Sequence, residues 1–418
     1  MKILVIAPRP PYPLYGGYEV RVYPLFKALS KRHDISLMSK SFSEHDQQSI
    51  AGLREVFSSV ELFPVQRQDA EQRSRDSILR RIANVWFPPV EYHDRTSFSA
   101  DMLESFERRV KNNEFDILHL LGLNVLRYVP GLEHLPAVCD AVDDYSLFCY
   151  RTMVHQKSLA CKLSFFLEWL ATRRFEKRFV PKFKEVVLVS PVDAAVMRKL
   201  SPTTRISVIP NGVDAEHFRS RSDAPRQPVL VFTGVMDYEP NVTGVLNFVK
   251  SILPLIEEKV PDVEFWIVGR DPEPQVLELA KARKNVKVTG FVDDMREYFD
   301  QAMVYVCPLI SGTGIKNKIL EAWSMEKAVV ATSMSCDGID VVDGEDIIVA
   351  DSPTDFSNSV IRLLKNNDLR TRLGVNARKK VIDRYSWESQ AAQFEELYRR
   401  VLQSGHRAEE RRSDSATP

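Results

Sequence analysis

The fold of this chain is decided by the stretch Pro308-Leu-Ile-Ser-Gly-Thr-Gly-Ile-Lys-Asn-Lys-Ile-Leu-Glu-Ala322. The apolar run at residues 304–307 before it predicts a buried strand, and the spacing of apolar residues after Gly314 predicts a helix. A strand, a glycine-bearing turn and a helix present free backbone N–H groups and a positive dipole end to an anion. The stretch therefore predicts a phosphate-binding loop made by Ser311, Gly312, Thr313 and Gly314.

Two lysines and a glutamate follow this loop. Lys316 and Lys318 are predicted to lie in the first turn of the helix, where cations are unfavourable unless an anion compensates them. Glu321 is three residues beyond Lys318, on the same helical face. A carboxylate there would accept both hydroxyls of a ribose whose phosphates bind the loop. The alternative is an ordinary strand-to-helix turn with solvated lysines and a surface glutamate.

The composition is typical of a soluble protein with more than one domain. The chain has 418 residues, 44% hydrophobic and 27% charged, and its 57 basic residues equal its 57 acidic residues. This balance gives no reason to expect nucleic acid as a partner. The 5 cysteines form no CxxC pair, which favours a reducing compartment and no metal site. No signal peptide or membrane span is predicted, so we expect a cytoplasmic protein.

The order of elements predicts an α/β fold in two parts, because strands and helices alternate along the chain. The first domain is expected at residues 1–209 and the second at 210–385, with a turn at 210–214 as the hinge. A helix over 386–404 is expected to complete the first domain, and 405–418 are expected to be disordered. Predicted strands are 2–7, 34–38, 115–119, 136–140, 185–189, 205–209, 229–233, 263–268, 286–289, 303–307, 328–331 and 346–349. Predicted helices include 44–57, 97–113, 157–184, 242–259, 274–283, 293–301, 315–325, 354–365 and 368–384, and residues 67–81 are expected to be irregular.

The predicted helix at 157–184 is rich in basic and aromatic residues. One interpretation is an amphipathic core helix with a solvated basic face. The other is a peripheral contact with anionic lipid at the inner face of the cytoplasmic membrane. Both interpretations stay open at the level of sequence.

The ordered set of motifs resembles glycosyltransferase family 4, whose members have the GT-B fold of two Rossmann-like parallel-sheet domains facing each other across a cleft. Within that family the chain is most similar to sugar transferases associated with exopolysaccharide and exosortase systems. The motifs that carry the resemblance are Val231-Phe-Thr-Gly-Val-Met-Asp-Tyr-Glu-Pro-Asn241, Ile267-Val-Gly-Arg-Asp-Pro272, Val288-Thr-Gly-Phe-Val-Asp-Asp-Met-Arg296 and Gly312-Thr-Gly-Ile-Lys-Asn-Lys-Ile-Leu-Glu-Ala322.

The resemblance implies transfer of a sugar from a nucleotide-sugar donor to a hydroxyl of a glycan or lipid-linked acceptor. It implies retention of anomeric configuration, no metal and no cofactor, with the donor in the second domain and the acceptor in the first. Glu321 matches the second glutamate of the family's E-x7-E motif, and Thr313 replaces the first. The usual arginine and lysine after the F-x-G strand are also missing, and Asn241 stands near the place of that lysine. We hypothesise that Lys316 and Lys318 replace this pair.

The resemblance names further candidates. His119, at the end of the predicted strand 115–119, matches the first histidine of an H-x-H motif and would hydrogen-bond the donor sugar or phosphate, or else be a structural residue. Asp143 and Asp144 are candidates for orienting the acceptor hydroxyl or for shielding positive charge on the reacting sugar, or else belong to a solvated turn. The turn at Phe291 and Val292 is a candidate for meeting the base, or else a simple turn with Asp293 as the helix N-cap. The remaining donor-binding candidates are Gly16, Gly17, Arg21, Gly234, Asp237 and Arg270.

Two other functions remain open. A sugar-nucleotide 2-epimerase would also use two α/β domains around a cleft, and a catalytically silent nucleotide-sugar or glycan-binding scaffold would explain the missing glutamate and arginine. The sequence leaves the nucleotide, the sugar, the acceptor and the oligomeric state undetermined.

Overall fold

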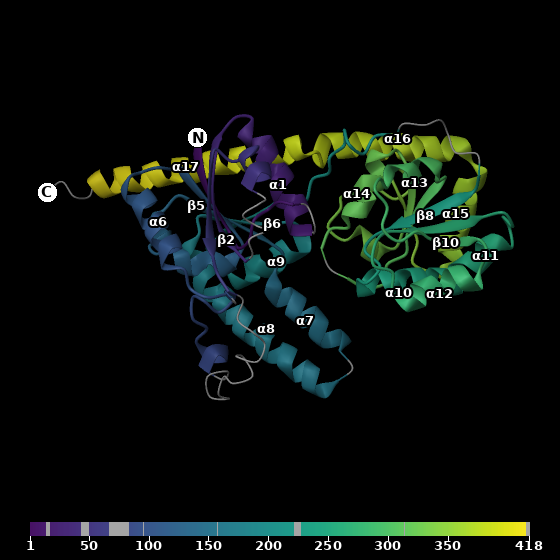
Figure 1. Cartoon of the computed structure of the whole chain (residues 1–418), viewed down its shortest axis with the longest axis horizontal. Helices are drawn as coiled ribbons and strands as arrows, with labels where there is room; N and C mark the ends of the chain where they lie inside the picture. The colour runs from purple at the N-terminus through teal and green to yellow at the C-terminus, as the bar shows by residue number, and fades with distance from the viewer. Residues whose placement is uncertain are drawn as a thin grey trace. The chain divides into compact units, whose positions relative to one another are not determined.

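The computed structural model describes residues 1–13, 17–42, 50–66, 83–94, 96–156, 158–220, 227–312 and 314–414, with backbone only for Gly17, His155 and 405–414. The chain divides into unit 1, Met1–Ile209 with Ala391–Pro418, and unit 2, Pro210–Gln390. Each unit is a parallel sheet covered by helices (Figure 1), which confirms the predicted α/β class with two Rossmann-like domains. The predictions for Gly16, Thr313, 67–81 and the start of the 44–57 helix lie outside the described residues.

Unit 1 contains a seven-stranded sheet in the order β3-β2-β1-β4-β5-β6-β7. All neighbouring strands are parallel, and the chain reverses its direction of growth between β1 and β4. The strands are β1 (Lys2–Ala7), β2 (Asp34–Ser41), β3 (Ser59–Pro64), β4 (Ile117–Leu121), β5 (Ala137–Val142), β6 (Glu185–Leu188) and β7 (Arg205–Val208). The α-helices are α1 (Gly17–Ser30), α3 (Ile50–Arg54), α6 (Ala100–Lys111), α7 (Tyr145–His155), α8 (Leu159–Phe179), α9 (Pro191–Leu200) and α17 (Trp387–Asp414).

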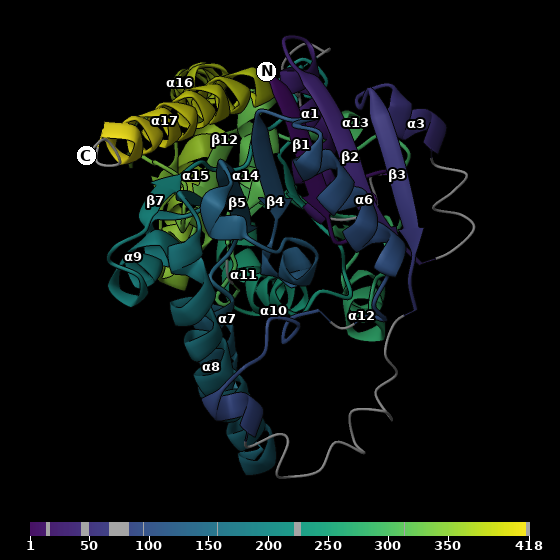
Figure 2. The same cartoon turned by 90° about the vertical axis from the view of Figure 1, so that its left-hand side faces the viewer.

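Several predictions for unit 1 were wrong in detail, and strand β3 was not predicted at all. Strand β4 begins and ends two residues later than predicted, because its buried side chains continue through Leu121. The sequence analysis also missed α7, which begins after Asp144, whose side chain accepts a hydrogen bond from the Leu147 N–H as an N-cap. Helices α7 and α8 pack along each other as a hairpin that extends away from the sheet (Figures 1 and 2).

Unit 2 contains a six-stranded parallel sheet in the order β10-β9-β8-β11-β12-β13. Its strands are β8 (Val229–Thr233), β9 (Glu264–Val268), β10 (Val286–Val288), β11 (Val304–Cys307), β12 (Ala328–Ala331) and β13 (Ile348–Val349). Its α-helices are α10 (Glu239–Asn247), α11 (Leu253–Glu257), α12 (Pro274–Ala282), α13 (Arg296–Gln301), α14 (Asn317–Ser324), α15 (Pro353–Lys365) and α16 (Asn367–Arg384). One π-helical turn, Phe248–Ile252, interrupts the single helix that was predicted over 242–259.

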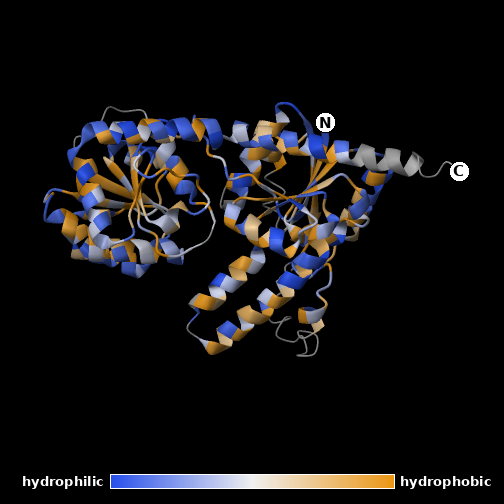
Figure 3. Cartoon of the chain, turned by 180° about the vertical axis from the view of Figure 1, so that it is seen from behind, coloured by the Kyte–Doolittle hydropathy of each residue, from blue (hydrophilic) through white to orange (hydrophobic). Residues whose placement is uncertain are grey.

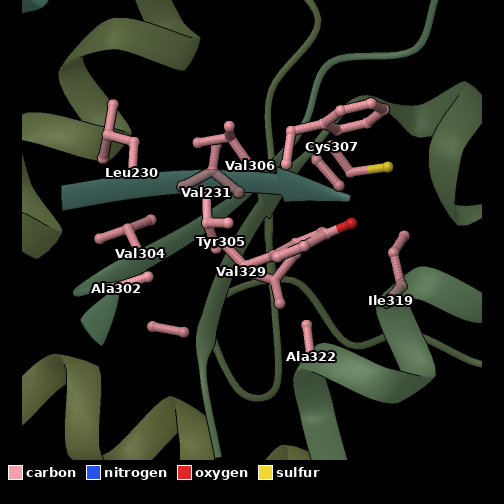
Figure 4. Close-up of a cluster of buried hydrophobic side chains, with 14 of the residues drawn as sticks. Leu230, Val231, Ala302, Val304, Tyr305, Val306, Cys307, Ile319, Ala322 and Val329 are labelled. Carbon is pink, nitrogen blue, oxygen red and sulfur yellow. The ribbon is translucent and has the colours of Figure 1, made fainter. Parts of the chain in front are cut away.

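The core of unit 2 fixes the orientation of α14. Ile319 and Ala322 on this helix are fully buried, as are Tyr305 and Val329 on the sheet (Figure 4). The Tyr305 hydroxyl is 3.0 Å from the Thr233 hydroxyl, near the carboxyl end of β8. Because one face of α14 is held against this core, its polar residues are held at the end of the sheet.

Helix α17 brings the end of the chain into unit 1. Ala391, Phe394 and Tyr398 are fully buried, and the Tyr398 hydroxyl is 2.6 Å from Nδ1 of His119 on β4. The helix continues to Asp414, which differs from the disorder predicted for 405–418. The run Arg407-Ala-Glu-Glu-Arg-Arg consists of strong helix formers, which accounts for the continuation. Residues 415–418 lie outside the described part.

Candidate active site

The candidate site in unit 2 lies where the order of strands reverses. Strands β8 and β11 are neighbours in the sheet, and the chain grows away from them in opposite directions. Ligands of open α/β sheets bind outside the carboxyl ends of strands at such a point. The carboxyl end of β8 leads to Gly234, and that of β11 leads to the loop at 308–316.

The floor of this site is built from glycine backbone. A Cβ atom added to Gly269 would lie 1.8 Å from the carbonyl oxygen of Gly234, so the ends of β8 and β9 touch through bare backbone. Gly269 also forms a bridge with Gly290, which follows β10. Only glycine at position 269 permits the close approach to Gly234, whereas a Cβ atom on Gly290 would meet nothing within 4 Å.

Lys318 lies above this floor. Its Nζ donates a hydrogen bond to the Asn241 side-chain oxygen at 2.6 Å and lies 4.1 Å from the ring centre of Phe232. A Cβ atom on Gly234 would come within 2.7 Å of the same ammonium. Burial lowers the pKa of Lys318 to about 8, and the neighbouring Lys316 lowers it further, against the opposing effect of Glu321. The ammonium therefore occupies the strand-end position itself.

Glu321 is partly buried and shares the polar face of α14 with Lys318. Burial raises the pKa of its carboxyl group to about 7, although the charge of Lys318 acts in the opposite direction. Among the described residues none donates a hydrogen bond to this carboxylate. A carboxylate that is partly removed from water usually accepts hydrogen bonds from the protein, and this one accepts none from the described residues. Groups with a shifted pKa are concentrated at functional sites.

Lys316 has a different position from the one predicted. Helix α14 begins at Asn317, so Lys316 is its N-cap and does not belong to the first turn. Its Nζ donates a hydrogen bond to the Gly314 carbonyl at 2.6 Å. A lysine side chain has no acceptor and cannot cap the first N–H groups of the helix. Of these groups, the Ile319 N–H donates to the Lys316 backbone carbonyl at 2.9 Å.

The loop after β11 rests on the start of α10. Ser311 Oγ is 3.5 Å from a carboxylate oxygen of Glu239, and a Cβ atom on Gly312 would contact Pro240 at 3.4 Å. The Asn241 side chain, whose oxygen binds Lys318, donates from its nitrogen to the Val235 carbonyl at 2.8 Å. The loop, α10 and α14 therefore form one connected unit around Lys318.

The other donor-binding candidates of unit 2 lie at the same edge of the sheet. Phe291 follows Gly290 and is 73% exposed, an unusual state for a large aromatic side chain. Val292 comes next in this turn, and Asp293 is not the N-cap of α13, which is Met295. Asp237 is exposed after β8, and Arg270 lies 3.6 Å from Asp271 after β9.

His119 does not lie at a strand end, and that prediction was wrong. It lies in the middle of β4, paired with Val5 and Val138, and has no exposed surface. Burial and the nearby Arg21 lower the pKa of its imidazole to about 3. A neutral ring packed against Phe26 and bonded to Tyr398 is a core residue.

Arg21 on α1 is buried and does not present a free charge. Its Nε and Nη2 donate to the two carboxylate oxygens of Asp140 at 3.1 Å each, and Nη2 also donates to the Ile209 carbonyl at 3.3 Å. The guanidinium is only 2% exposed. Gly17 is the first residue of α1, and of it the structure describes only the backbone.

Asp143 follows β5 and lines a cavity of unit 1 together with Glu176 of α8. The sequence analysis did not single out Glu176, nor did it find the roles of Phe232 and Tyr305 beside α14. The hydrogen bond between Ser146 and Glu176 joins residues 30 positions apart, and that between Thr233 and Tyr305 joins residues 72 apart, so no local motif signals them.

Comparison with known proteins assigns the chain to a class. Residues 15–217 match the family described as Glycosyltransferase Family 4, and residues 227–366 match the one described as Glycosyl transferases group 1. Since these matches cover most of the chain, the protein belongs to the GT-B glycosyltransferases.

Individual relatives agree with this class. An uncharacterized 44.6 kDa protein in the cps region of Klebsiella pneumoniae is 20% identical over 90% of this chain and 94% of its own. A phosphatidyl-myo-inositol mannosyltransferase of Mycolicibacterium smegmatis is 29% identical over 47% of this chain and 52% of its own. The structure of Anabaena HepE in complex with UDP aligns with a TM-score of 0.62 over 95% of this chain and 99% of its own, at 15% identity.

Proposed function

We propose that this glycosyltransferase moves a sugar from a nucleotide-sugar donor to a hydroxyl acceptor with retention of configuration, in the synthesis of an exopolysaccharide or another cell-surface glycan. The cps-region location of the Klebsiella relative supports a role in cell-surface glycan synthesis. The UDP bound by Anabaena HepE supports a nucleotide-sugar donor. The site at the ends of β8 and β11 would bind the nucleotide.

In this proposal Lys318 binds the donor pyrophosphate. Its Nζ already contacts Asn241, the residue near the place of the family's missing lysine, so an amine from α14 reaches the position that α10 no longer supplies. The uncapped N–H groups at the start of α14 add oriented donors for the same anion. Fixed positive charge of this kind stabilises a diphosphate leaving group without a metal ion.

Glu321 in turn binds the ribose. Its carboxylate lies on the Lys318 face of α14 and lacks a donor among the described residues, and two ribose hydroxyls would supply the missing hydrogen bonds. This unmatched carboxylate beside a desolvated lysine, at the switch point of the sheet, is the observation that carries the proposal.

A thermal-shift panel of uridine, guanosine, adenosine and thymidine diphosphates tests the donor site. Stabilisation follows RT ln(1 + [L]/Kd), so a ligand at ~100 times Kd adds about 2.7 kcal/mol. We expect one base to stand out, and we expect Glu321→Ala to reduce the shift of every ribonucleotide, because the ribose contact is common to them. Equal, negligible shifts for all four nucleotides would refute the assignment.

Release of nucleoside diphosphate separates the rival functions. A transferase releases it in an acceptor-dependent manner, an epimerase interconverts nucleotide sugars without an acceptor, and a silent scaffold does neither. The anomeric configuration of the product, read by NMR, tests retention.

We also propose that the protein works at the inner face of the cytoplasmic membrane, through the α7–α8 hairpin. The residues from 145 to 182 include 8 Lys or Arg and 2 Asp or Glu, whereas the whole chain is neutral. Large apolar side chains are exposed on the same hairpin, among them Leu159 at 82% and Leu163 at 60%. Figure 3 shows hydrophobic stretches along both helices of this hairpin. Exposed apolar residues flanked by cations suit anionic headgroups above an acyl layer. Among the described helices none is both long and apolar enough to cross a membrane.

A further inference from the structure

Unit 1 contains a cavity of about 240 Å³ that the donor site does not use. It lies at the carboxyl ends of β4 and β5, the neighbouring strands that lead to Gly122 and Asp143. The first residue of α7, Tyr145, and the α8 residue Glu176 form part of its wall. The carboxyl edge of a parallel sheet is the usual place for a ligand.

The backbone at this edge is held in an unusual conformation. Val142, the last residue of β5, has a φ of 66°, a left-handed value that a β-branched residue rarely adopts. Strain of this kind costs about 1–3 kcal/mol and is concentrated at functional sites. Here it accompanies a tight turn in which the Asp143 N–H donates to the Ala141 carbonyl at 2.9 Å, and both residues line the cavity.

Two polar atoms lining the cavity lack a partner among the described residues. Glu176 is 1% exposed, and its Oε1 accepts from the Ser146 N–H at 3.4 Å, whereas Oε2 has no hydrogen bond. The side-chain oxygen of Asn124 is buried and equally unpaired. A buried polar atom without a partner costs about 1–3 kcal/mol, and a ligand that bonds to both atoms would recover this cost.

The protonation state of Glu176 decides whether the ligand must donate or accept the hydrogen bond to this side chain. Burial raises its pKa well above the ordinary value, and the carboxylate of Asp144 raises it further. Asp144 itself is held by hydrogen bonds from Ser146 Oγ at 2.6 Å and Leu147 N–H at 2.8 Å. A raised pKa favours the protonated form of Glu176, which can donate an O–H, and the side-chain oxygen of Asn124 can accept. A sugar hydroxyl both donates and accepts, so it satisfies both groups.

The remaining walls suit a neutral ring. Leu123, Ala141 and Met197 are apolar, and Tyr145 adds an aromatic side chain. The surrounding acidic groups disfavour an anion. The described residues contain no group of three or more His, Cys, Asp and Glu side chains that could hold a metal ion. The volume is below the ~300–1,000 Å³ of sites for drug-sized ligands, so it fits one ring and no more.

We infer that this cavity binds a single pyranose unit of the acceptor, with Glu176 donating to one ring hydroxyl and Asn124 accepting from a hydroxyl. That this ring belongs to the acceptor rests on the proposed function, whereas binding of a pyranose in the cavity does not depend on sugar transfer. Glu176 is thereby an acceptor-positioning residue on a helix far from the donor site in sequence.

Saturation-transfer NMR on the full chain tests this binding directly. The probes are the methyl α-pyranosides of glucose, galactose and mannose, each titrated alone and in the absence of donor. The variants are Ala141→Leu, which fills the cavity without a change of charge, Glu176→Gln, which keeps a neutral donor, and Glu176→Met, which removes it. Glu133→Gln is the matched control, because this unit 1 carboxylate lies outside the cavity and pairs with Lys182 at the surface.

We expect at least one glycoside to bind the wild type and the control equally. Ala141→Leu should abolish binding, Glu176→Met should weaken it roughly five- to tenfold, the value of one buried hydrogen bond, and Glu176→Gln should stay within about threefold. Absence of binding by all three glycosides, or binding that Ala141→Leu leaves unchanged, overturns the inference. If an acceptor substrate is found, an unchanged acceptor KM in Ala141→Leu overturns the inference while the proposed function stands. If the wild type binds a glycoside but no nucleotide, the proposed function fails while binding of the ring in this cavity stands.

Discussion

At the scale of single residues, the two ionisable groups on α14 make nucleotide binding depend on pH. Below its pKa of about 7, Glu321 is protonated and accepts fewer hydrogen bonds from ribose. Above its pKa of about 8, Lys318 loses the charge that attracts a pyrophosphate. We therefore expect affinity for nucleoside diphosphate to be highest between about pH 7 and 8 and to fall on both sides.

Calorimetric titration at a series of pH values measures this profile. Glu321→Gln should lower the affinity and flatten the acidic limb, and Lys318→Met should do the same to the alkaline limb. A profile that keeps both limbs in both variants would contradict the assignment of these groups.

The pair of Arg21 and Asp140 is expected to act in stability. Arg21→Met leaves the buried Asp140 carboxylate without its partner, which should lower the free energy of unfolding by about 3–5 kcal/mol. Lys182→Met is the control, because Lys182 pairs with Glu133 and the two side chains are 41% and 45% exposed, so about 1 kcal/mol or less is expected. Urea unfolding measures both. If Arg21→Met changed the free energy of unfolding by no more than the control does, a stabilising role of the Arg21–Asp140 pair would be refuted.

At the scale of elements, two lysines at the start of α14 have different contacts. Lys318 contacts the strand end at Gly234, and Lys316 ties the loop through the Gly314 carbonyl. We expect Lys318→Ala and Lys316→Ala both to lower kcat far more than they change the acceptor KM, by about 100-fold or more for a lost contact to the leaving group. Steady-state kinetics measures the split. Lys259→Ala, at an exposed surface pair, is the control, and normal turnover in the Lys316 variant refutes its role.

The α7–α8 hairpin is the second element that carries a prediction. Leu159→Glu with Leu163→Glu should reduce partitioning onto vesicles containing anionic lipid by at least tenfold, because each buried leucine contributes about 1.5–3 kcal/mol. Val375→Glu, on an exposed apolar residue of α16, should leave it unchanged. Vesicle flotation measures the difference. Equal flotation of all variants, or binding that ignores both salt and anionic lipid, would count against membrane contact.

At the scale of the whole molecule, the carboxyl-terminal helix closes the core of the amino-terminal unit. Truncation after Gln390 removes Phe394 and Tyr398 and leaves His119 without its hydroxyl partner. We expect the truncated chain to lose the cooperative unfolding of unit 1, whereas Tyr398→Phe should cost only about 1 kcal/mol, the value of one hydrogen bond. Thermal unfolding followed by circular dichroism distinguishes the two. A truncated chain with an unaltered transition would show that the helix adds nothing to that core.

The sequence by itself determined the α/β class, most strand positions and the shared face of Lys318 and Glu321. These follow from local rules, since helical and strand periodicity and glycine turns are set within a few residues. It failed where distant segments decide the outcome. His119 became a core residue because α17 covers it, and Arg21 became an internal ion pair because Asp140 lies across the sheet from α1.

The tertiary structure alone decided which polar groups share a site. Lys318 reaches the end of β8 because Ile319 and Ala322 hold α14 against the sheet. Glu176 and Asn124 line one cavity because Phe175 and Phe179 of α8 pack in the same core as β4 and β5. A motif fixes which side chains leave a helix on the same face. What those side chains meet depends on packing between segments that no local spacing encodes.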